Sequence, residues 1–451
     1  MKRTSFLLII AVAAVFTANL AAPSAGAETI TVQLWSRADR SGPDRAGNIV
    51  RAAALLNKQF RAAGVETRVA VEVHENNARG YDGDALALLK AFAVGRGPDL
   101  FVAAHEWVGE FAEAGYAMDL EAHIEDHPEY YGDIIPALWE AVRYKGRRYA
   151  IPQDSEVRML FFNKEMLRRA GKDDAFIDSL PARVDRGEVT IWDLSRLAKE
   201  LVDGGIAKYG ILHRPNVGPD FLMTFAAFGM RFADPTSGKL LLETGPLGEA
   251  LRWFAWNAEN GVTPRNNTSM SWDAVKRSWY DGRTFIFHNG VWNVPEQIRA
   301  GWPGEEAAYF RRAGWMHVPP SKLGGNPANL SHPIVYCINP NSPRRALAAT
   351  LAGIASLHYF NTIHAVRTFH TAINHGQAAM PAYRDHWALA AATPLLARAS
   401  FMPNHPLFGR YNAILFKGLQ GVELGRLTPE EGVEFITDEM AFELGEEVIV
   451  R

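Results

Sequence analysis

The sequence predicts an α/β protein built of two lobes, and three observations lead to this prediction. Strand-like and helix-like segments alternate over the first part of the chain, as in a sheet covered by helices. The chain keeps 424 of its 451 residues after a 27-residue leader, which is more than one hydrophobic core usually serves. Further on, polar residues interrupt apolar strands at three places, as expected where a chain crosses between lobes.

The leader has the three parts of a secretory signal peptide, and we expect it to comprise residues 1–27. Lys2 and Arg3 precede an apolar run over 6–16, which is followed by the small residues 25–27. This run of 11 residues is too short to span a bilayer, which needs about 20. No later stretch would serve, and no cysteine lies near 27 to carry a lipid. We therefore expect a periplasmic protein without a membrane anchor.

Charge and cysteine content exclude several classes of protein. The 47 basic residues, two of them in the leader, against 50 acidic ones give the mature chain a formal charge of −5. This balance gives no reason to expect a nucleic-acid or anionic-membrane partner. Cys337 is the only cysteine, so an internal disulfide is excluded.

The first elements predict a parallel sheet with a crevice at one edge. Strands are expected at 28–36, 68–75 and 99–104, and helices at 43–60 and 85–94. In such sheets ligands bind beyond the carboxyl ends of the strands. Polar and aromatic residues stand at all three ends, namely Trp35-Ser36, Glu75-Asn76-Asn77 and His105-Glu106-Trp107. Any one of these could be a helix cap or a partly buried aromatic residue, but together they favour one crevice.

The later chain predicts three crossings between lobes. Polar residues 153–156 separate two apolar strand segments, the Pro- and Gly-rich stretch 318–343 contains a strand, and 371–385 follows two helices. A helix is expected at 190–201, and a buried strand should end at His288-Asn289-Gly290. The expected lobes are 28–153 with about 329–375, and 154–328 with about 376–451.

Aromatic residues beside polar ones favour a sugar as ligand. Near loops or the starts of elements lie Trp35, Trp107, Trp192, Trp272 and Trp292, each next to a polar residue. Flat apolar faces beside carboxylates and amides match the C–H faces and hydroxyl rim of a sugar. Each tryptophan taken alone could equally be structural.

Motifs for other chemistries are missing. The histidines 358, 364, 370 and 375 are spaced by 6, 6 and 5 residues, so consecutive pairs would not share a face of one helix. No H-E-x-x-H or paired-cysteine motif, phosphate-binding loop or G-x-S-x-G elbow occurs. We therefore expect neither metal nor cofactor. A glycosidase stays possible, because Glu75, Glu106, Asp154 and Glu156 could supply two carboxylates. The favoured interpretation is that these carboxylates form hydrogen bonds to the hydroxyl groups of a ligand and catalyse no reaction.

Five segments in order resemble a known family. They are "GRGPDLFVAAHEWVGEFAEAGYAMDL", "GRRYAIPQDSEVRMLFFNKEML", "TIWDLSRLAKEL", "FGMRFADPTSGKLLL" and "WYDGRTFIFHNGVW". The chain resembles the extracellular solute-binding proteins of ABC sugar importers, the family that includes maltose-binding protein. This resemblance implies a two-lobe periplasmic binding protein fold with a three-segment hinge and a ligand cleft between the lobes.

The resemblance also implies roles for particular residues. Glu106 is the carboxylate after the third strand, Glu156 the acid on the crossing strand, and Trp292 the stacking aromatic of the second lobe. Tyr411 lies near the place of a late aromatic. Departures at Phe162, Ile286-Phe287 and Trp107 leave the fold intact and argue against a maltodextrin specificity.

The sequence thus predicts a monomeric, non-enzymatic protein that captures a sugar or sugar derivative and delivers it to an ABC permease. The expected ligand-binding residues are Trp35, Glu75, Asn76, His105, Glu106, Trp107, Asp154, Glu156, Asn216, Trp272, Asn289, Trp292 and Tyr411. Two alternatives stay open, a secreted glycosidase and a binder of a phosphorylated or sulfonated sugar. In the latter case Arg79 and Arg214 would hold the anion.

Overall fold

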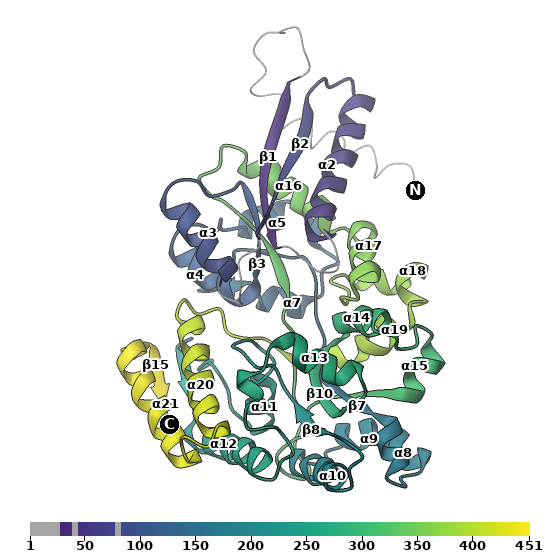
Figure 1. Cartoon of the computed structure of the whole chain (residues 1–451). Coiled ribbons are helices and arrows are strands. Elements are labelled where there is room, and N and C mark those ends of the chain that lie inside the picture. The colour runs from purple at the N-terminus through teal and green to yellow at the C-terminus, as the bar shows by residue number, and fades with distance from the viewer. Residues whose placement is uncertain (1–27, 38–43, 77–82) are drawn as a thin grey trace.

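The computed structural model describes residues 28–37, 44–76 and 83–451. The predicted leader at 1–27 and the predicted anion ligand Arg79 lie outside these ranges, as does Asn77. Two lobes lie one above the other in Figure 1, each built around its own sheet. Helices cover both sheets.

The first sheet has the strand order β2-β1-β3-β13-β6. β1 runs parallel to β2 and β3, which confirms the predicted parallel arrangement of the first three strands. β13 runs antiparallel to both β3 and β6, so the sheet as a whole is mixed. The bounds are β1 Thr29–Arg37, β2 Arg68–Asn76, β3 Leu100–Ala104, β6 Ile151–Pro152 and β13 Ile334–Ile338.

The helices of the first lobe pack on this sheet and form one core with it. Cys337 is buried within this core, on β13. The helices are α2 Asp44–Ala62, α3 Gly83–Ala93, α4 Val108–Glu113, α5 Glu121–Asp126, α6 Pro128–Tyr131, α7 Pro136–Glu140, α16 Arg345–Ser356 and α17 His358–Thr368, with the 3₁₀ turn η1 His105–Trp107.

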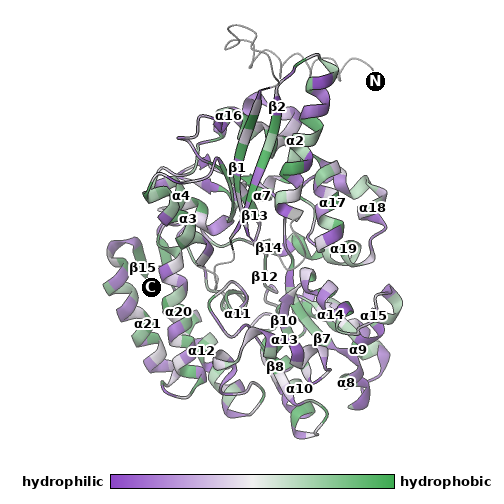
Figure 2. Ribbon diagram, turned by 45° about the horizontal axis from the view of Figure 1, so that its top comes forward, coloured by the Kyte–Doolittle hydropathy of each residue, from purple (hydrophilic) through white to green (hydrophobic). Residues whose placement is uncertain are grey.

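The second sheet has the order β11-β7-β10-β8. β7 is antiparallel to β10 and β11, whereas β10 is parallel to β8. Every residue of β7 is buried, because the two faces of the strand belong to different cores: Leu160 and Phe162 to one, Met159 and Phe161 to the other. Figure 2 shows the hydrophobic colour along such strands and hydrophilic residues on outer helices. The bounds are β7 Arg158–Asn163, β8 Tyr209–Leu212, β10 Thr284–Gly290 and β11 Ala313–Met316.

Helices surround the second sheet and extend toward the C-terminus, except α18, which packs against α17 of the first lobe. They are α8 Lys164–Arg169, α9 Asp174–Asp185, α10 Ile191–Asp203, α11 Leu222–Ala227, α12 Thr244–Glu259, α13 Trp272–Tyr280, α14 Val294–Arg299, α15 Glu306–Arg312, α18 Pro381–Arg384, α19 Trp387–Ala392, α20 Phe408–Glu423 and α21 Pro429–Leu444. The 3₁₀ turns are η2 Asn267–Ser269, η3 Val291–Asn293, η4 His375–Ala379, η5 Thr393–Arg398 and η6 Gly445–Glu447.

Three short pairs of strands complete the structure. β12 Asn329–Leu330 pairs in parallel with β14 Ala399–Ser400, and β15 Val448–Val450 pairs in parallel with β9 Leu240–Leu242. β4 Arg143–Tyr144 and β5 Arg147–Arg148 form an antiparallel hairpin.

The chain passes between the two sheets where the sequence predicts crossings. Residues 153–157 join β6 to β7, and residues 331–333 join β12 to β13. After α17 the chain returns beside the first of these segments, where the amide of Thr371 donates to the carbonyl of Ser155 at 2.8 Å. The exact division of the chain into lobes stays a prediction.

In the part of the chain that the structure describes, no single helix has the length and apolar character to cross a membrane. α16 and α17 reach that threshold only as a pair bent by 66°.

Candidate functional site

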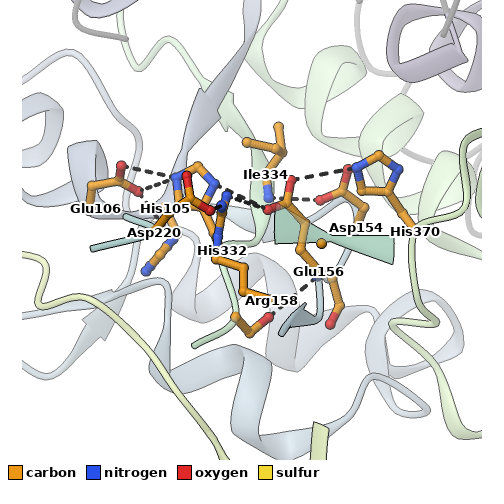
Figure 3. A network of polar contacts seen from close by, with 12 residues as sticks. His105, Glu106, Asp154, Glu156, Arg158, Asp220, His332, Ile334 and His370 are labelled. Atoms are coloured by element: carbon orange, nitrogen blue, oxygen red, sulfur yellow. Dashed lines mark hydrogen bonds and ion pairs between the residues drawn. The ribbon is translucent and has the colours of Figure 1, made fainter. Parts of the chain in front are cut away.

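Charged side chains from both lobes and all three crossing segments meet in one buried network (Figure 3). η1 supplies His105 and Glu106 directly after β3. The first crossing supplies Asp154 and Glu156, the second His332, and the third His370. The sequence predicts the first four of these six residues.

His332 links two of the predicted carboxylates. Its Nε2 donates to Glu106 Oε1 at 3.0 Å, and its Nδ1 lies 3.5 Å from Glu156 Oε2. Burial acts to lower the pKa of His332, but the two carboxylates outweigh burial and raise this pKa. The pKa of Glu156 is well below its usual value, because Arg158, His332 and His370 overcome the opposing effect of burial. The two carboxylates therefore favour the protonated form of His332.

His105 lies beside this group as a neutral ring. It is fully buried, its Nδ1 lies 3.2 Å from Glu106 Oε2, and its ring meets that of His332 edge-on at 5.4 Å between centroids. Burial and the neighbouring His332 lower the pKa of His105 well below its usual value.

Arg158 connects the network to the second lobe. Its Nη2 donates to Glu156 Oε2 at 2.8 Å, and its Nη1 contacts Asp220. The guanidinium lies over the ring of Trp292, 4.6 Å from the centroid. Asp220 also accepts from Arg214 Nη1 at 3.3 Å. One carboxylate thus serves two guanidinium groups.

Asp154 holds the crossing segments together. Its Oδ2 accepts from Arg45 Nη2 at 2.7 Å, and its Oδ1 accepts from the amide of Ile334 at 2.9 Å. His364 Nε2 lies 3.3 Å from the same carboxylate. Burial lowers the pKa of His364 to about 4. Because Asp154 is fully buried and bound to α2, β13 and α17, it fixes the scaffold of the site.

The helical spacing of the histidines is a poor guide here, because they do not lie on one helix. α17 ends at Thr368, and Phe369 has a left-handed backbone with φ 57°. This turn brings His370 back to His364, with 5.2 Å between ring centroids. The expectation that consecutive histidines stay apart is therefore wrong for this pair.

Two groups of side chains in the described part of the chain have the spacing of metal ligands, with all ligand atoms of a group within 4.8 Å. One is His105, Glu106 and His332, and the other is Asp154, His364 and His370. In the second group the guanidinium of Arg45 already neutralises Asp154. The prediction that the protein binds neither metal nor cofactor stays a prediction.

The remaining predicted residues are more scattered. Trp35 is half-buried against His74, with 4.5 Å between rings, and Glu75 is exposed at the end of β2. Asn76 ends β2, and its side chain lies outside the described part. Asn216 is exposed and accepts from Arg214 Nε at 2.9 Å.

Two further predicted residues, Trp272 at the start of α13 and Asn289 near the end of β10, lie beside the network. Trp272 is half-buried, and the guanidinium of Arg214 lies 5.7 Å from its ring centroid. Asn289 is buried near the end of β10, where its Oδ1 accepts from the amide of Gly290 at 2.8 Å.

Trp107 and Tyr411, both predicted as ligand-binding residues, lie in the cores of the two lobes, and their part in binding stays a prediction. Trp107 packs into the core of the first lobe from η1. Tyr411 is fully buried in the core of the second lobe, and its hydroxyl donates to the carbonyl of Leu241 at 2.7 Å.

His332, His370, Arg158 and Asp220 are not among the ligand-binding residues predicted from the sequence. His332 lies two residues before β13 and Arg158 is the first residue of β7, whereas the predicted residues of the first lobe stand at the ends of strands. Because β13 is antiparallel to β3, its first residue pairs with Ala104, next to η1. β7 is antiparallel to β10, so Arg158 pairs with Gly290. The segments "SHP" and "EVR", which contain His332 and Arg158, can be assigned to the site only once the directions of β13 and β7 are known.

Comparison with known proteins agrees with this architecture. Residues 52–336, more than half of the chain, match the model of the bacterial extracellular solute-binding protein family. The maltotriose-binding protein of Pyrococcus abyssi is 28% identical over 216 residues, which span 48% of this chain and 42% of that protein. A binding protein of Brucella abortus is 23% identical over 345 residues, 75% of this chain and 77% of its own.

Solved structures show the fold. The GacH receptor of Streptomyces glaucescens, studied unliganded and with acarbose, has a TM-score of 0.73 at 17% identity over 93% of this chain and 99% of its own. A tagatose-bound ABC transporter solute-binding protein of Thermotoga lettingae has a TM-score of 0.71 at 21% identity, over 92% and 100%. The α/β periplasmic binding protein fold is thereby confirmed, and the chain belongs to the bacterial extracellular solute-binding protein family.

Proposed function

We propose that this protein is the sugar-binding component of an ABC importer, which captures a sugar or sugar derivative in the periplasm and delivers it to a membrane permease. The observation that carries the proposal is the convergence of charged and aromatic side chains from both lobes at the crossing segments. Glu106, His332, Glu156 and Arg158 form its centre. The names of the relatives, which include binders of maltotriose and tagatose, support a carbohydrate.

A site of this kind suits a ligand with many hydroxyl groups. A buried polar group without a partner costs about 1 to 3 kcal/mol, so each hydroxyl must find a donor or acceptor when the lobes enclose the ligand. Carboxylates, guanidinium groups and histidines provide both. Part of the interaction energy then offsets the cost of closing the lobes.

The alternative of a glycosidase is disfavoured by the ionisation of the carboxylates. A glycosidase needs one carboxylic acid with a raised pKa to protonate the leaving group. Glu156 has instead a lowered pKa, with Arg158 as the largest favourable influence against burial. Family membership supports the same conclusion, because the family consists of solute-binding proteins.

The periplasmic location rests on the predicted leader and on membership of an extracellular protein family. Delivery to a permease follows from the same membership.

A calorimetric titration of the refolded mature protein, beginning at Glu28, tests the proposal against a panel of sugars and sugar derivatives. A ligand that binds only the folded state also raises the melting temperature. We expect at least one member of the panel to bind with a dissociation constant of about 1 μM or below. If no sugar or derivative binds ligand-free protein, the proposed function fails.

Trp292→Ala should weaken binding of that ligand about tenfold or more, because it removes the ring against which Arg158 lies. Trp256→Ala is the matched control, since Trp256 is a half-buried tryptophan of the second lobe that packs against Trp192, 6.0 Å between rings. Equal affinities of the two variants would remove Trp292 from the binding site.

A further inference from the structure

We propose that the ligand is an acidic sugar, whose carboxylate, sulfate or phosphate group binds to the guanidinium groups of Arg158 and Arg214 in the second lobe. This inference rests on the proposed function and names the class of its substrate. It is carried by the stacking, the hydrogen bonding and the charge of these two arginines.

The two tryptophans at this place pack against arginines. The indole faces that could stack on a sugar are therefore partly covered by guanidinium groups. Trp272 has Arg214 over its ring at 5.7 Å and Phe287 beside it at 5.7 Å between centroids. Trp292 has Arg158 over its ring at 4.6 Å and lies nearly parallel to His370, with 15° between the rings. A guanidinium that stacks on an aromatic ring keeps its N–H edge for a planar anion. The second lobe thus offers N–H edges where bare indole rings would suit a neutral sugar.

The donors of these arginines exceed the acceptors around them. Arg158 is only 4% exposed, yet its buried Nε has no hydrogen-bond partner. Arg214 uses Nε for Asn216 and Nη1 for Asp220, which leaves its Nη2 without a partner in the described part of the chain. A sugar hydroxyl that accepts such a bond still needs an acceptor for its own proton. A carboxylate, sulfate or phosphate group supplies acceptors alone.

The carboxylates near Arg158 and Arg214 are shared with other cationic or basic side chains, which favours binding of a further anion. Asp220 is the carboxylate that Arg158 and Arg214 share, and the other carboxylate of Arg158, Glu156, also lies 3.5 Å from His332 and from His370. The pKa of Arg214 is lowered by burial, and the nearby charges of Arg158 and Arg37 add to this effect against the opposing influence of Asp220. Asp220 therefore does not offset the combined effect of burial and the neighbouring guanidinium groups on Arg214.

Arg37 adds a positive charge from the first lobe. It ends β1, pairs with Asp84 at 2.9 Å and is 32% exposed, whereas Arg214 across the lobe boundary is 20% exposed. Like charges on two lobes oppose closure. An anion between them would turn this repulsion into attraction from both sides.

Titration calorimetry of the mature protein with paired probes tests the inference. The pairs are D-glucuronate with D-glucose and D-galacturonate with D-galactose, and D-glucose 6-sulfate and D-glucose 6-phosphate extend the series. We expect at least one acid to bind about tenfold or more tightly than its neutral counterpart, the gain of a charge-assisted, paired contact. Tighter binding of the uronates points to a carboxylate as the anion, and tighter binding of the esters points to sulfate or phosphate.

Arg214→Gln should abolish the preference for the acid. Arg196→Gln is the matched control, because Arg196 lies on α10 of the same lobe, is 60% exposed and pairs with Asp193; it should keep the preference. Should Arg214→Gln fail to fold, Arg214→Lys retains the charge without the forked donors and should reduce the preference.

Two failures can be told apart. Neutral sugars that bind as tightly as their acids would overturn the inference and leave the sugar-binding function standing. An unchanged preference in the folded Arg214 variant would overturn it as well. If neither neutral nor acidic sugars bind, the proposed function itself fails.

Discussion

His213 and Glu423 form a fully buried pair in the second lobe. His213 follows β8 and Glu423 ends α20, and Nε2 lies 2.9 Å from Oε2. Burial acts to lower the pKa of His213, but Glu423 and the carbonyl of Arg214 outweigh it, so the pKa of His213 is raised above 6.5. A base whose pKa is raised on folding is stabilising below its unfolded pKa, and this contribution disappears as the pH rises through the folded pKa.

This pair should make part of the stability dependent on pH above about 6.5. Replacing Glu423 with Gln removes the charge that raises the pKa of His213, so the free energy of unfolding should fall less between about pH 6 and pH 9 than in the unaltered protein. Urea unfolding at both pH values measures the difference. Parallel pH profiles of the two proteins would show that the pair does not titrate in this range.

At the scale of single elements, the end of β10 depends on a glycine. A Cβ added to Gly290 would lie 1.7 Å from Cζ3 of Trp292, because η3 folds the indole back over the strand end. Gly290→Ala should therefore displace Trp292 from Arg158 and weaken ligand binding about tenfold.

The control for this variant is Gly248→Ala, within α12, where the nearest atom to an added Cβ is 3.5 Å away. It should leave affinity unchanged, and calorimetry compares the two variants. An unaltered affinity in Gly290→Ala would mean that the position of Trp292 does not matter for binding.

The start of α10 depends on a reciprocal cap. Thr190 Oγ1 accepts from the amide of Asp193 at 3.1 Å, and Asp193 Oδ2 accepts from the amide of Thr190 at 2.8 Å. Thr190→Ala should lower the free energy of unfolding by about 1 kcal/mol, since it leaves an amide of the first turn without its partner. Denaturant unfolding measures the loss. Thr350→Ala, within α16, should cost less, because alanine has the higher helix propensity and no cap is lost; an equal loss would contradict the capping role.

At the scale of the whole molecule, neither lobe is one continuous piece of chain. β13 lies between β3 and β6 in the first sheet, yet it comes about 180 residues after β6 in sequence. A fragment of residues 28–152 therefore lacks a central strand and exposes the edges of both neighbours. We expect it to show no cooperative thermal transition by circular dichroism.

Joining residues 329–375 to this fragment through a Gly/Ser linker supplies β13, α16 and α17, and should restore a cooperative transition. A cooperative transition in the shorter fragment alone would contradict the structural role of β13. Failure of the fused chain to fold would contradict the predicted bounds of the first lobe.

Much of the fold could be predicted because it follows from local patterns. The alternation in 29–36, the capping residue Thr190 and the break between helix and strand at Gly97-Pro98 are properties of neighbouring residues. The site was predicted in part for the same reason. His105 and Glu106 follow a strand, and a strand that follows the β-α-β order has a known direction.

The structure decided what local pattern could not. His332 and Arg158 reach the site because β13 and β7 run antiparallel to their neighbours, and His370 does so because the backbone turns at Phe369. Trp107 and Tyr411 have the polar neighbours of a surface aromatic, yet they pack inward. The sequence by itself determined the elements, their order and the polar residues at three strand ends. Only the tertiary structure decided which charges meet, because strand direction and the inward face of a turn depend on contacts between residues far apart in the chain.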